Sequence, residues 1–131
     1  MKRLERFPHD DPREWLNRAR SNLTRARNPA SGVYLEDLCF DAQQAAEKAI
    51  KALMIARGIE FPYVHDVDHL LSLLEERGGA IPGTIRRASE LTKYATVTRY
   101  PGTLRPVTEV EYTEAVELAA AVVRWAEGQL P

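Results

Sequence analysis

The sequence predicts an all-α protein, an antiparallel bundle of four to five helices joined by short connections. Three observations carry this prediction. Apolar residues recur at helical spacing in five segments, glycines and prolines fall between these segments, and no stretch alternates apolar and polar residues as a half-buried strand does. The widest apolar face belongs to residues 33–57, which we therefore expect at the centre of the bundle.

The first helix is predicted over residues 12–27. Asp11 can cap it, and Pro12 suits the first helical position, where its missing N–H group would have no partner in any case. The apolar stripe of this helix consists of Trp15, Leu16, Ala19, Leu23 and Ala26. Residues 28–32 are typical of a turn and separate this helix from the next.

The second helix is predicted over residues 33–57, and Gly58 is placed to end it. Its apolar residues span an arc of roughly 160°, wider than the stripe of a surface helix. They are Leu38, Ala42, Ala45, Ala46, Ala49, Ile50, Ala52, Leu53 and Ala56. Gln43, Glu47 and Lys51 stack four residues apart on the opposite side. Lys48 and Lys51 face either solvent or a bound anion, or else Lys51 forms a buried or interface hydrogen-bond network with the rest of its row.

The next two elements are an extended connector and a short helix. The connector is predicted over residues 59–64, because Phe61 precedes a proline and is disfavoured from helical angles. The third helix begins near Asp66 and stops at Gly78 and Gly79. Its apolar residues are Val67, Leu70, Leu71 and Leu74.

Two further helices complete the prediction. The fourth covers residues 84–97, with apolar residues Ile85, Ala88, Leu91 and Tyr94. The last helix opens with a capping box, in which Thr108 is the cap and Glu111 lies three residues further on, and it frays at Gly128. Its apolar side consists of Tyr112, Ala115, Val116, Ala119, Val122, Val123 and Ala126.

Composition describes one soluble domain over residues 1–131, with a helical core at about residues 11–127 and a short N-terminal extension. The single cysteine, Cys39, excludes an internal disulfide and lies near the edge of the apolar arc, so we predict a core thiol. The sequence has neither a signal peptide nor an apolar run of about 20 residues. We therefore expect a cytoplasmic protein without a membrane span.

The net charge of −1 conceals two basic segments. Residues 1–27 hold eight lysines and arginines against four acids, and residues 82–106 hold five against one. Two basic segments on an acidic body could converge into a site for phosphates or nucleic acid. The alternative is that both segments are solvated helix faces.

His65 and His69 have a spacing that can bind a metal on one helix, with Asp66 and Asp68 nearby. However, no third histidine is close in sequence, the HExxH pattern is missing, and His65 is expected to precede the helix. The alternative is that Asp66 caps the third helix and His65 forms a local hydrogen bond. We therefore predict neither a metal nor a cofactor.

Arg99 and Tyr100 suggest a phosphate-binding site. A guanidinium at a helix end, next to an aromatic ring and a proline turn, suits a bidentate phosphate contact beside a stacking surface. In the alternative interpretation, Tyr94 and Tyr100 lie in the core and Arg99 pairs with an acid such as Glu47.

These motifs follow one another in a specific order. They are Trp15 with Leu16, the run from Gln43 to Leu53, Gly58, Phe61 with Pro62, His65 with Asp66, and Tyr94 with Arg99-Tyr100-Pro101. In this combination the chain resembles the HEPN domain (higher eukaryotes and prokaryotes nucleotide-binding), over about residues 11–127. The resemblance implies a four- or five-helix bundle that forms a homodimer through its long helices.

The resemblance also implies two kinds of function. Many prokaryotic members of the family act with a small nucleotidyltransferase in a two-component system, often of toxin–antitoxin type. Others are metal-independent RNases with an Arg, four to six residues and a His near the start of the last helix. Here no histidine follows Arg99, and Arg3 with His9 has the bare spacing only ahead of the first helix, where we treat the match as accidental. RNA cleavage thus lacks an evident general acid or base.

The leading hypothesis is a non-catalytic HEPN-type protein that binds nucleotide or nucleic acid as a homodimer, as the partner of a small nucleotidyltransferase. The predicted binding residues are Arg99, Tyr100, Lys51, His65 and Tyr94, with Gln43 and Glu47 orienting them or joining the dimer. One alternative is a divergent RNase that uses His65 or Tyr100. The other is a purely structural interaction module.

Overall fold

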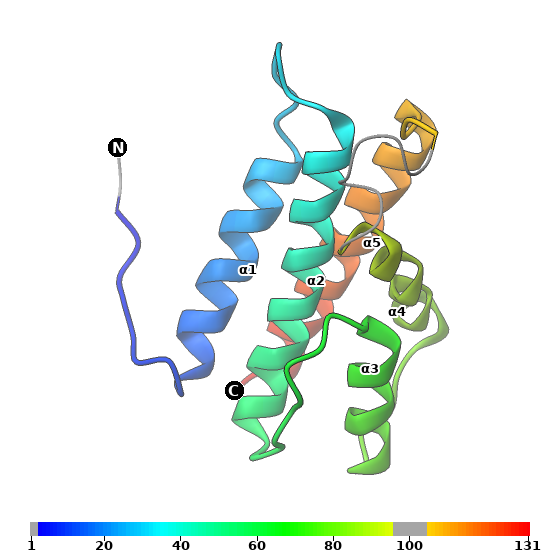
Figure 1. Cartoon of the computed structure of the whole chain (residues 1–131). Coiled ribbons are helices and arrows are strands. Elements are labelled where there is room, and N and C mark those ends of the chain that lie inside the picture. Colours follow the sequence, from blue (N-terminus) through cyan, green and yellow to red (C-terminus); the bar gives the residue numbers. More distant parts are fainter. Residues whose placement is uncertain (1–2, 96–104) are drawn as a thin grey trace.

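The computed structural model describes residues 3–95 and 105–131. Within these ranges every regular element is a helix and no residue lies in a strand, as predicted. In chain order the elements are α1 (Pro12–Ala26), α2 (Leu35–Ala56), α3 (Val67–Glu76), α4 (Gly83–Arg86), the 3₁₀ helix η1 (Arg87–Tyr94) and α5 (Glu109–Gln129) (Figure 1).

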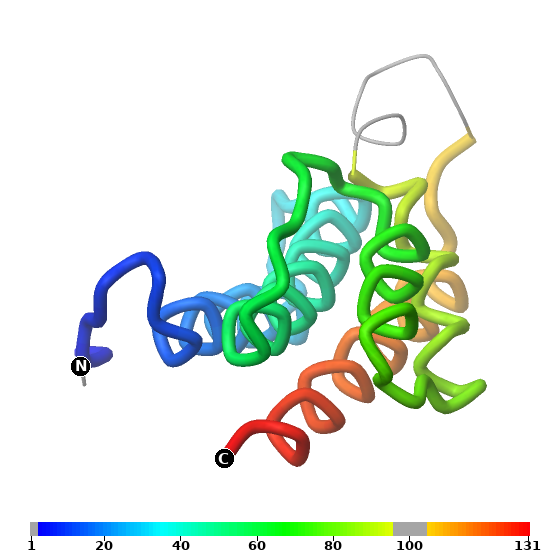
Figure 2. The backbone as a smooth tube through the Cα atoms, turned by 90° about the horizontal axis from the view of Figure 1, so that it is seen from below, coloured from blue at the N-terminus to red at the C-terminus, as the bar shows by residue number. Residues whose placement is uncertain are grey.

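The long helix α2 lies at the centre of the bundle, as its wide apolar arc predicts. α1 packs along one side of α2 in the opposite direction, α5 packs behind it, and α3 with η1 covers another side (Figures 1 and 2). Of the predicted arc, only Ala56 in the last turn is exposed. The largest fully buried apolar side chains come from four of the elements and are Ile50, Leu53, Met54, Leu70, Leu71, Leu74, Leu91, Val67, Val122 and Val123.

The helix ends follow the capping residues expected from the sequence. The Asp11 side chain accepts a hydrogen bond from the N–H of Arg13 at 2.9 Å at the start of α1. The Asp66 side chain accepts one from the N–H of His69 at 3.2 Å at the start of α3. Gly58 has a φ of +68° just after α2, a left-handed conformation that favours glycine and lets the chain leave the helix.

The prediction of one continuous α-helix over residues 84–97 is wrong in form. Only Gly83–Arg86 is α-helical and Arg87–Tyr94 is a 3₁₀ helix, while residues 96 and 97 lie outside the described part of the chain. The buried side chains of this stretch are spaced three residues apart and are Ile85, Ala88, Leu91 and Tyr94. A helix with three residues per turn places such a row on one face, whereas in an α-helix the row turns by about 60° at each step.

The N-terminal extension, residues 3–11, lies on the side of α1 that faces away from α2 (Figures 1 and 2). Its backbone is hydrogen-bonded to α1 side chains at three points. The extension is therefore packed as an additional layer on α1. None of the described helices combines the length and the apolar character that a bilayer span requires.

The start of α5 offers a direct test of the capping residues. Thr108 and Glu111 exchange hydrogen bonds of 3.0 and 3.1 Å between the side chain of one and the N–H of the other, which confirms the predicted capping box. Thr108→Ala should lower the free energy of unfolding by about 1 kcal/mol, because an N–H of the first turn loses its partner. Urea denaturation followed by circular dichroism measures this change.

The matched control is Thr113→Ala, at an exposed position in the same helix. It should change the free energy of unfolding by less than about 0.5 kcal/mol. An equal loss in both variants would contradict the capping role of Thr108.

Candidate functional site

The polar row of α2 lies inside the protein. Gln43, Glu47 and Lys51 are 0%, 4% and 5% exposed. The connector between α2 and α3, together with Trp15 of α1, contacts this row. Of the arrangements that the sequence left open, the structure contains the buried hydrogen-bond network.

Glu47 is the centre of this network. Its Oε2 accepts a hydrogen bond from Lys51 Nζ at 2.9 Å, and its Oε1 accepts one from Gln43 Nε2 at 2.9 Å. The Nδ1 of His65 lies 2.9 Å from the same Oε1. Burial alone would raise the pKa of Glu47, but the hydrogen bonds from Lys51, Gln43 and His65 together hold it below its usual value. The carboxylate is therefore ionised at neutral pH.

Two aromatic rings also surround the ammonium group of Lys51. Its Nζ lies 5.0 Å from the ring centre of Phe61 and 6.0 Å from that of Trp15, within the range of cation–π attraction. The two rings meet edge to face with their centroids 5.6 Å apart. The sequence predicted that Lys51 contacts phosphate. Such a contact would require its ammonium group to leave both the two aromatic rings and the Glu47 carboxylate.

The connector is fastened to the network through its backbone. Gln43 Nε2 donates a hydrogen bond to the carbonyl of His65 at 3.2 Å, and Lys51 Nζ donates one to the carbonyl of Val64 at 3.5 Å. Tyr63 is fully exposed, and the side chain of His65 is 58% exposed. The connector therefore holds two ring side chains at the surface on a fixed backbone. Tyr63 was not among the predicted binding residues, because residues 59–64 are mostly apolar and their pattern does not indicate which ring is exposed.

The other predicted binding residues lie elsewhere. Tyr94 is buried next to Cys39, eight residues and about 12 Å before Glu47 along α2. Burial raises the pKa of both groups to about 12, so the phenol and the thiol are neutral at physiological pH. Cys39 is a core thiol, as predicted. Arg99 and Tyr100 lie outside the described residues.

A second polar network joins α1 to α2 and has no counterpart among the predicted site residues. Lys48 Nζ donates a hydrogen bond to Asn22 Oδ1 at 2.8 Å, and Asn22 Nδ2 donates one to Asp41 Oδ1 at 3.0 Å. Arg25 lies 3.4 Å from the other carboxylate oxygen of Asp41. Burial lowers the pKa of Lys48. The sequence signal was present, since Asn22 occupies a position on the apolar stripe of α1.

The histidine pair does not form a metal site. His65 contacts Glu47, and Asp66 caps α3, which is the alternative interpretation of this segment. In residues 3–95 and 105–131, no group of three or more His, Cys, Asp and Glu side chains could hold a metal ion.

The two basic segments do not meet in the part of the chain that the structure describes. The extension and α1 lie on one side of α2, and α4 with η1 lies on the other (Figures 1 and 2). Many arginines of both segments make ion pairs with acidic side chains. They are Arg13, Arg18, Arg20, Arg25, Arg86, Arg87 and Arg105.

Removing the cation from the buried network should be costly. Lys51→Met leaves the Glu47 carboxylate buried without its charged partner, so the free energy of unfolding should fall by about 3–5 kcal/mol. Lys48→Met is the matched control on the same helix, because Lys48 bonds the neutral Asn22, and it should cost about 1 kcal/mol. Chemical denaturation of both variants measures the contrast, and equal losses would contradict it.

The ionised state of Glu47 predicts a pH dependence. Its pKa in the folded protein lies below the value of 4.5 expected for an unperturbed glutamate, so the network stabilises the fold fully above about pH 4.5. This stabilisation is lost as the pH falls through the folded pKa. The difference in unfolding free energy between the wild type and Glu47→Gln should therefore shrink from pH 7 to pH 3. A difference that stays constant would argue against a buried carboxylate anion.

Comparison with known proteins identifies the family. The HEPN domain model matches residues 12–129. TT1696 from Thermus thermophilus is a similar solved structure, with 37% identity and a TM-score of 0.80 over 91% of this chain and 98% of that chain. ST0689, an archaeal HEPN homologue, has 33% identity and a TM-score of 0.75 over 92% of this chain and 98% of that one. No curated protein matches the chain. Because the family match covers nearly the whole sequence, this protein belongs to the HEPN domain family, a nucleotide-binding and RNase-associated family.

Proposed function

We propose that the protein is a non-catalytic HEPN-type protein that binds a nucleotide or nucleic acid as a homodimer, and that a small nucleotidyltransferase is its partner in a two-component, toxin–antitoxin-like system. The observation that carries the binding function is the connector, which holds exposed Tyr63 and His65 on a backbone fastened to a buried ionic network.

The connector has the properties of a nucleobase-binding surface. Exposed ring side chains can stack on a base, and a backbone that is already ordered loses little conformational entropy when the ligand binds. Gln43 and Lys51 bond the connector carbonyls, and Glu47 holds Lys51 in place. We therefore assign these three residues a positioning role.

The phosphate contact in this proposal comes from Arg99, beside Tyr100. In the sequence, Arg99 and Tyr100 follow η1. Thr92 of η1 accepts a hydrogen bond of 3.1 Å from the N–H of Val67, so η1 is joined to the start of α3, close to the end of the connector. Tyr94 ends η1 and is buried beside Cys39, so its ring does not line the connector surface.

The absence of catalysis is proposed from the sequence. Its three histidines are His9, His65 and His69, and all of them precede Arg99. The RNases of the family that the chain resembles carry a histidine shortly after the arginine. Without it, the segment after Arg99 lacks the histidine that would act as general acid or base in RNA cleavage.

A surface for a second copy or a partner lies where α2 and α5 begin. Val33 and Tyr34 directly precede α2, Val110 lies in the first turn of α5, and all three are exposed. A hydrogen bond of 2.9 Å from the N–H of Val107 to Glu36 joins these two helix starts. Exposed apolar side chains gathered at one end are typical of an interaction surface, which supports the proposed dimer and partner.

One observation favours a second candidate function, a divergent RNase. Glu47 lies 2.9 Å from His65 Nδ1, and the remainder of the imidazole is exposed. A carboxylate that orients a histidine in this way is the arrangement of a general acid or base. In this alternative, His65 replaces the histidine that is absent after Arg99.

Fluorescence anisotropy with labelled RNA and nucleotides tests the leading proposal. Arg99→Ala should weaken binding by about tenfold to a hundredfold, the loss expected for a charge-assisted hydrogen bond. Tyr63→Ala should weaken it by a similar factor if its ring stacks on a base. The control Thr24→Ala changes an exposed residue of α1 outside the connector and outside the proposed dimer surface, and it should leave the affinity for RNA unchanged. Equal affinities for the wild type, Arg99→Ala and Tyr63→Ala would contradict the proposed site.

The same samples distinguish the alternatives. Cleavage of RNA by the purified protein that is abolished in His65→Ala would establish the RNase instead. Binding of a protein partner that does not respond to salt would favour a structural interaction module, because phosphate recognition weakens steeply as salt rises. A tagged pull-down at low salt that retains a small nucleotidyltransferase in stoichiometric amount would support the two-component system, and its absence would remove that part of the proposal.

A further inference from the structure

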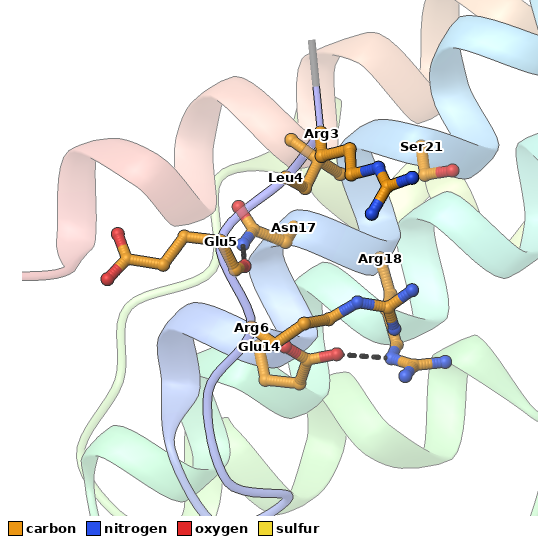
Figure 3. A pocket seen from close by; sticks show the side chains of 8 residues that line it. All are labelled: Arg3, Leu4, Glu5, Arg6, Glu14, Asn17, Arg18 and Ser21. Carbon is orange, nitrogen blue, oxygen red and sulfur yellow. Dashed lines mark hydrogen bonds and ion pairs between the residues drawn. The ribbon is translucent and has the colours of Figure 1, made fainter.

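A large hollow lies between the N-terminal extension and α1. It has a volume of about 620 Å³ and is lined by Arg3, Leu4, Glu5, Arg6, Glu14, Asn17, Arg18 and Ser21 (Figure 3). Half of these residues belong to the extension, which precedes the part of the chain that matches the HEPN family at residues 12–129. The extension side of the hollow therefore lies outside the family match, and its α1 side lies within it.

The extension is held in a defined position on α1. The N–H of Phe7 donates a hydrogen bond to Glu14 Oε1 at 3.0 Å, and Asn17 Nδ2 donates one to the carbonyl of Glu5 at 2.9 Å. Further along, Trp15 Nε1 donates a hydrogen bond to the carbonyl of His9 at 2.6 Å. These contacts fix the backbone on both sides of Arg6.

The charges in the hollow are unbalanced. Glu14 is occupied by the N–H of Phe7 and by Arg18, whose Nε lies 2.7 Å from its second oxygen. Neither Arg3 nor Arg6 forms an ion pair with any residue in the described ranges, although the charge of Arg6 contributes, after the hydrogen bonds from Phe7 and Arg18, to lowering the pKa of Glu14. Figure 3 shows the side chains of Arg3, Arg6 and Arg18 extending to the same side, whereas the carboxylate of Glu5 points away from them. Two guanidinium groups are thus left free to bind an anion.

A second hollow continues the first one toward the connector. It has a volume of about 360 Å³ and shares Glu14 and Arg18 with the first. Its other lining residues are Phe7, His9, Trp15 and Lys48. Trp15 contacts Phe61 of the connector, so the cationic hollow, the aromatic hollow and the connector follow one another along the surface. Guanidinium groups next to aromatic rings are the combination that binds the backbone and the bases of single-stranded RNA.

We propose that the extension and α1 form a phosphate-binding groove for single-stranded RNA, in which Arg3 and Arg6 bind the phosphodiester backbone and the aromatic hollow receives a base. This proposal rests on the proposed nucleic-acid function. It adds the class of ligand, single-stranded RNA, and a second binding surface. From Glu14 to Ser21 the groove follows α1 for about 10 Å, which suits an extended strand better than a single nucleotide.

The test compares two double variants with the same change in net charge. Arg3→Gln/Arg6→Gln removes the free guanidinium groups of the groove. Arg27→Gln/Arg124→Gln removes two exposed arginines outside it, at the far end of α1 and on α5. The probe is a labelled 12-nucleotide oligouridylate, measured by fluorescence anisotropy between 50 and 200 mM salt. Thermal unfolding of each variant verifies that the fold is intact.

The groove variant should bind the oligouridylate at least about tenfold more weakly, and the slope of log affinity against log salt should decrease in magnitude by about 1.4, the value for two lost phosphate contacts. The control variant should lose less than about threefold. Equal losses in the two variants, or no loss in either, would overturn the groove. Binding of oligoglutamate as tight as that of the oligouridylate would overturn the assignment to nucleic acid. Displacement of the oligouridylate by ATP, at the same total concentration of phosphate groups, would overturn the assignment to an extended strand.

The outcomes also separate this groove from the connector surface. Loss of binding in Arg3→Gln/Arg6→Gln with no loss in Tyr63→Ala or Arg99→Ala supports the groove and contradicts the connector. The reverse result supports the connector and overturns the groove.

Discussion

The structure depends on one constraint, a carboxylate on the central helix that is buried in the bundle. Glu47 is almost fully enclosed, and an isolated ionised carboxylate in such a place would cost several kcal/mol in lost hydration. Lys51 supplies the opposite charge one helical turn away, and Gln43 and His65 supply further hydrogen bonds. Because Gln43 and Lys51 also bond the connector carbonyls, satisfying this charge fixes the path of the chain from α2 to α3. The charge network and the surface above it therefore form or fail together.

The second network has a different effect, because it joins two helices. Asn22 of α1 connects Lys48 and Asp41, which both lie on α2, so the polar atoms can all be satisfied in one register of the two helices. If α1 shifted by one turn along α2, buried polar groups would lose their partners. This loss would destabilise the shifted alignment, even where its alanine-rich surfaces still made apolar contacts. Apolar packing supplies the stability of the α1–α2 pair, and we infer that the polar network specifies its alignment.

The sequence predicted the elements well because their causes are local. Capping by Asp11, Asp66 and Thr108 and the apolar arc of residues 33–57 depend on neighbours within a few positions. The burial of Gln43, Glu47 and Lys51 does not have a local cause. Periodicity predicts that the three residues share one face of the helix, but it does not predict that the connector and Trp15 cover this face through tertiary contacts. The 3₁₀ helix could have been anticipated from its three-residue spacing. The pairing of the basic segments with acids distant in sequence could not.

The distribution of charge in the interior determines where binding chemistry can lie. In the described bundle, Lys51 and Lys48 are committed to internal partners and most arginines are committed to acids. The described groups that remain at the surface without such a commitment include the ring of Tyr63 on the connector and the guanidinium groups of Arg3 and Arg6 on the extension. These three exposed side chains can change without disturbing the packed core, because they contribute little to it. A helical bundle in which most arginines pair with acids is thus suited to carry binding side chains on its connecting and terminal segments, so that affinity for a ligand and stability of the fold are set by different residues.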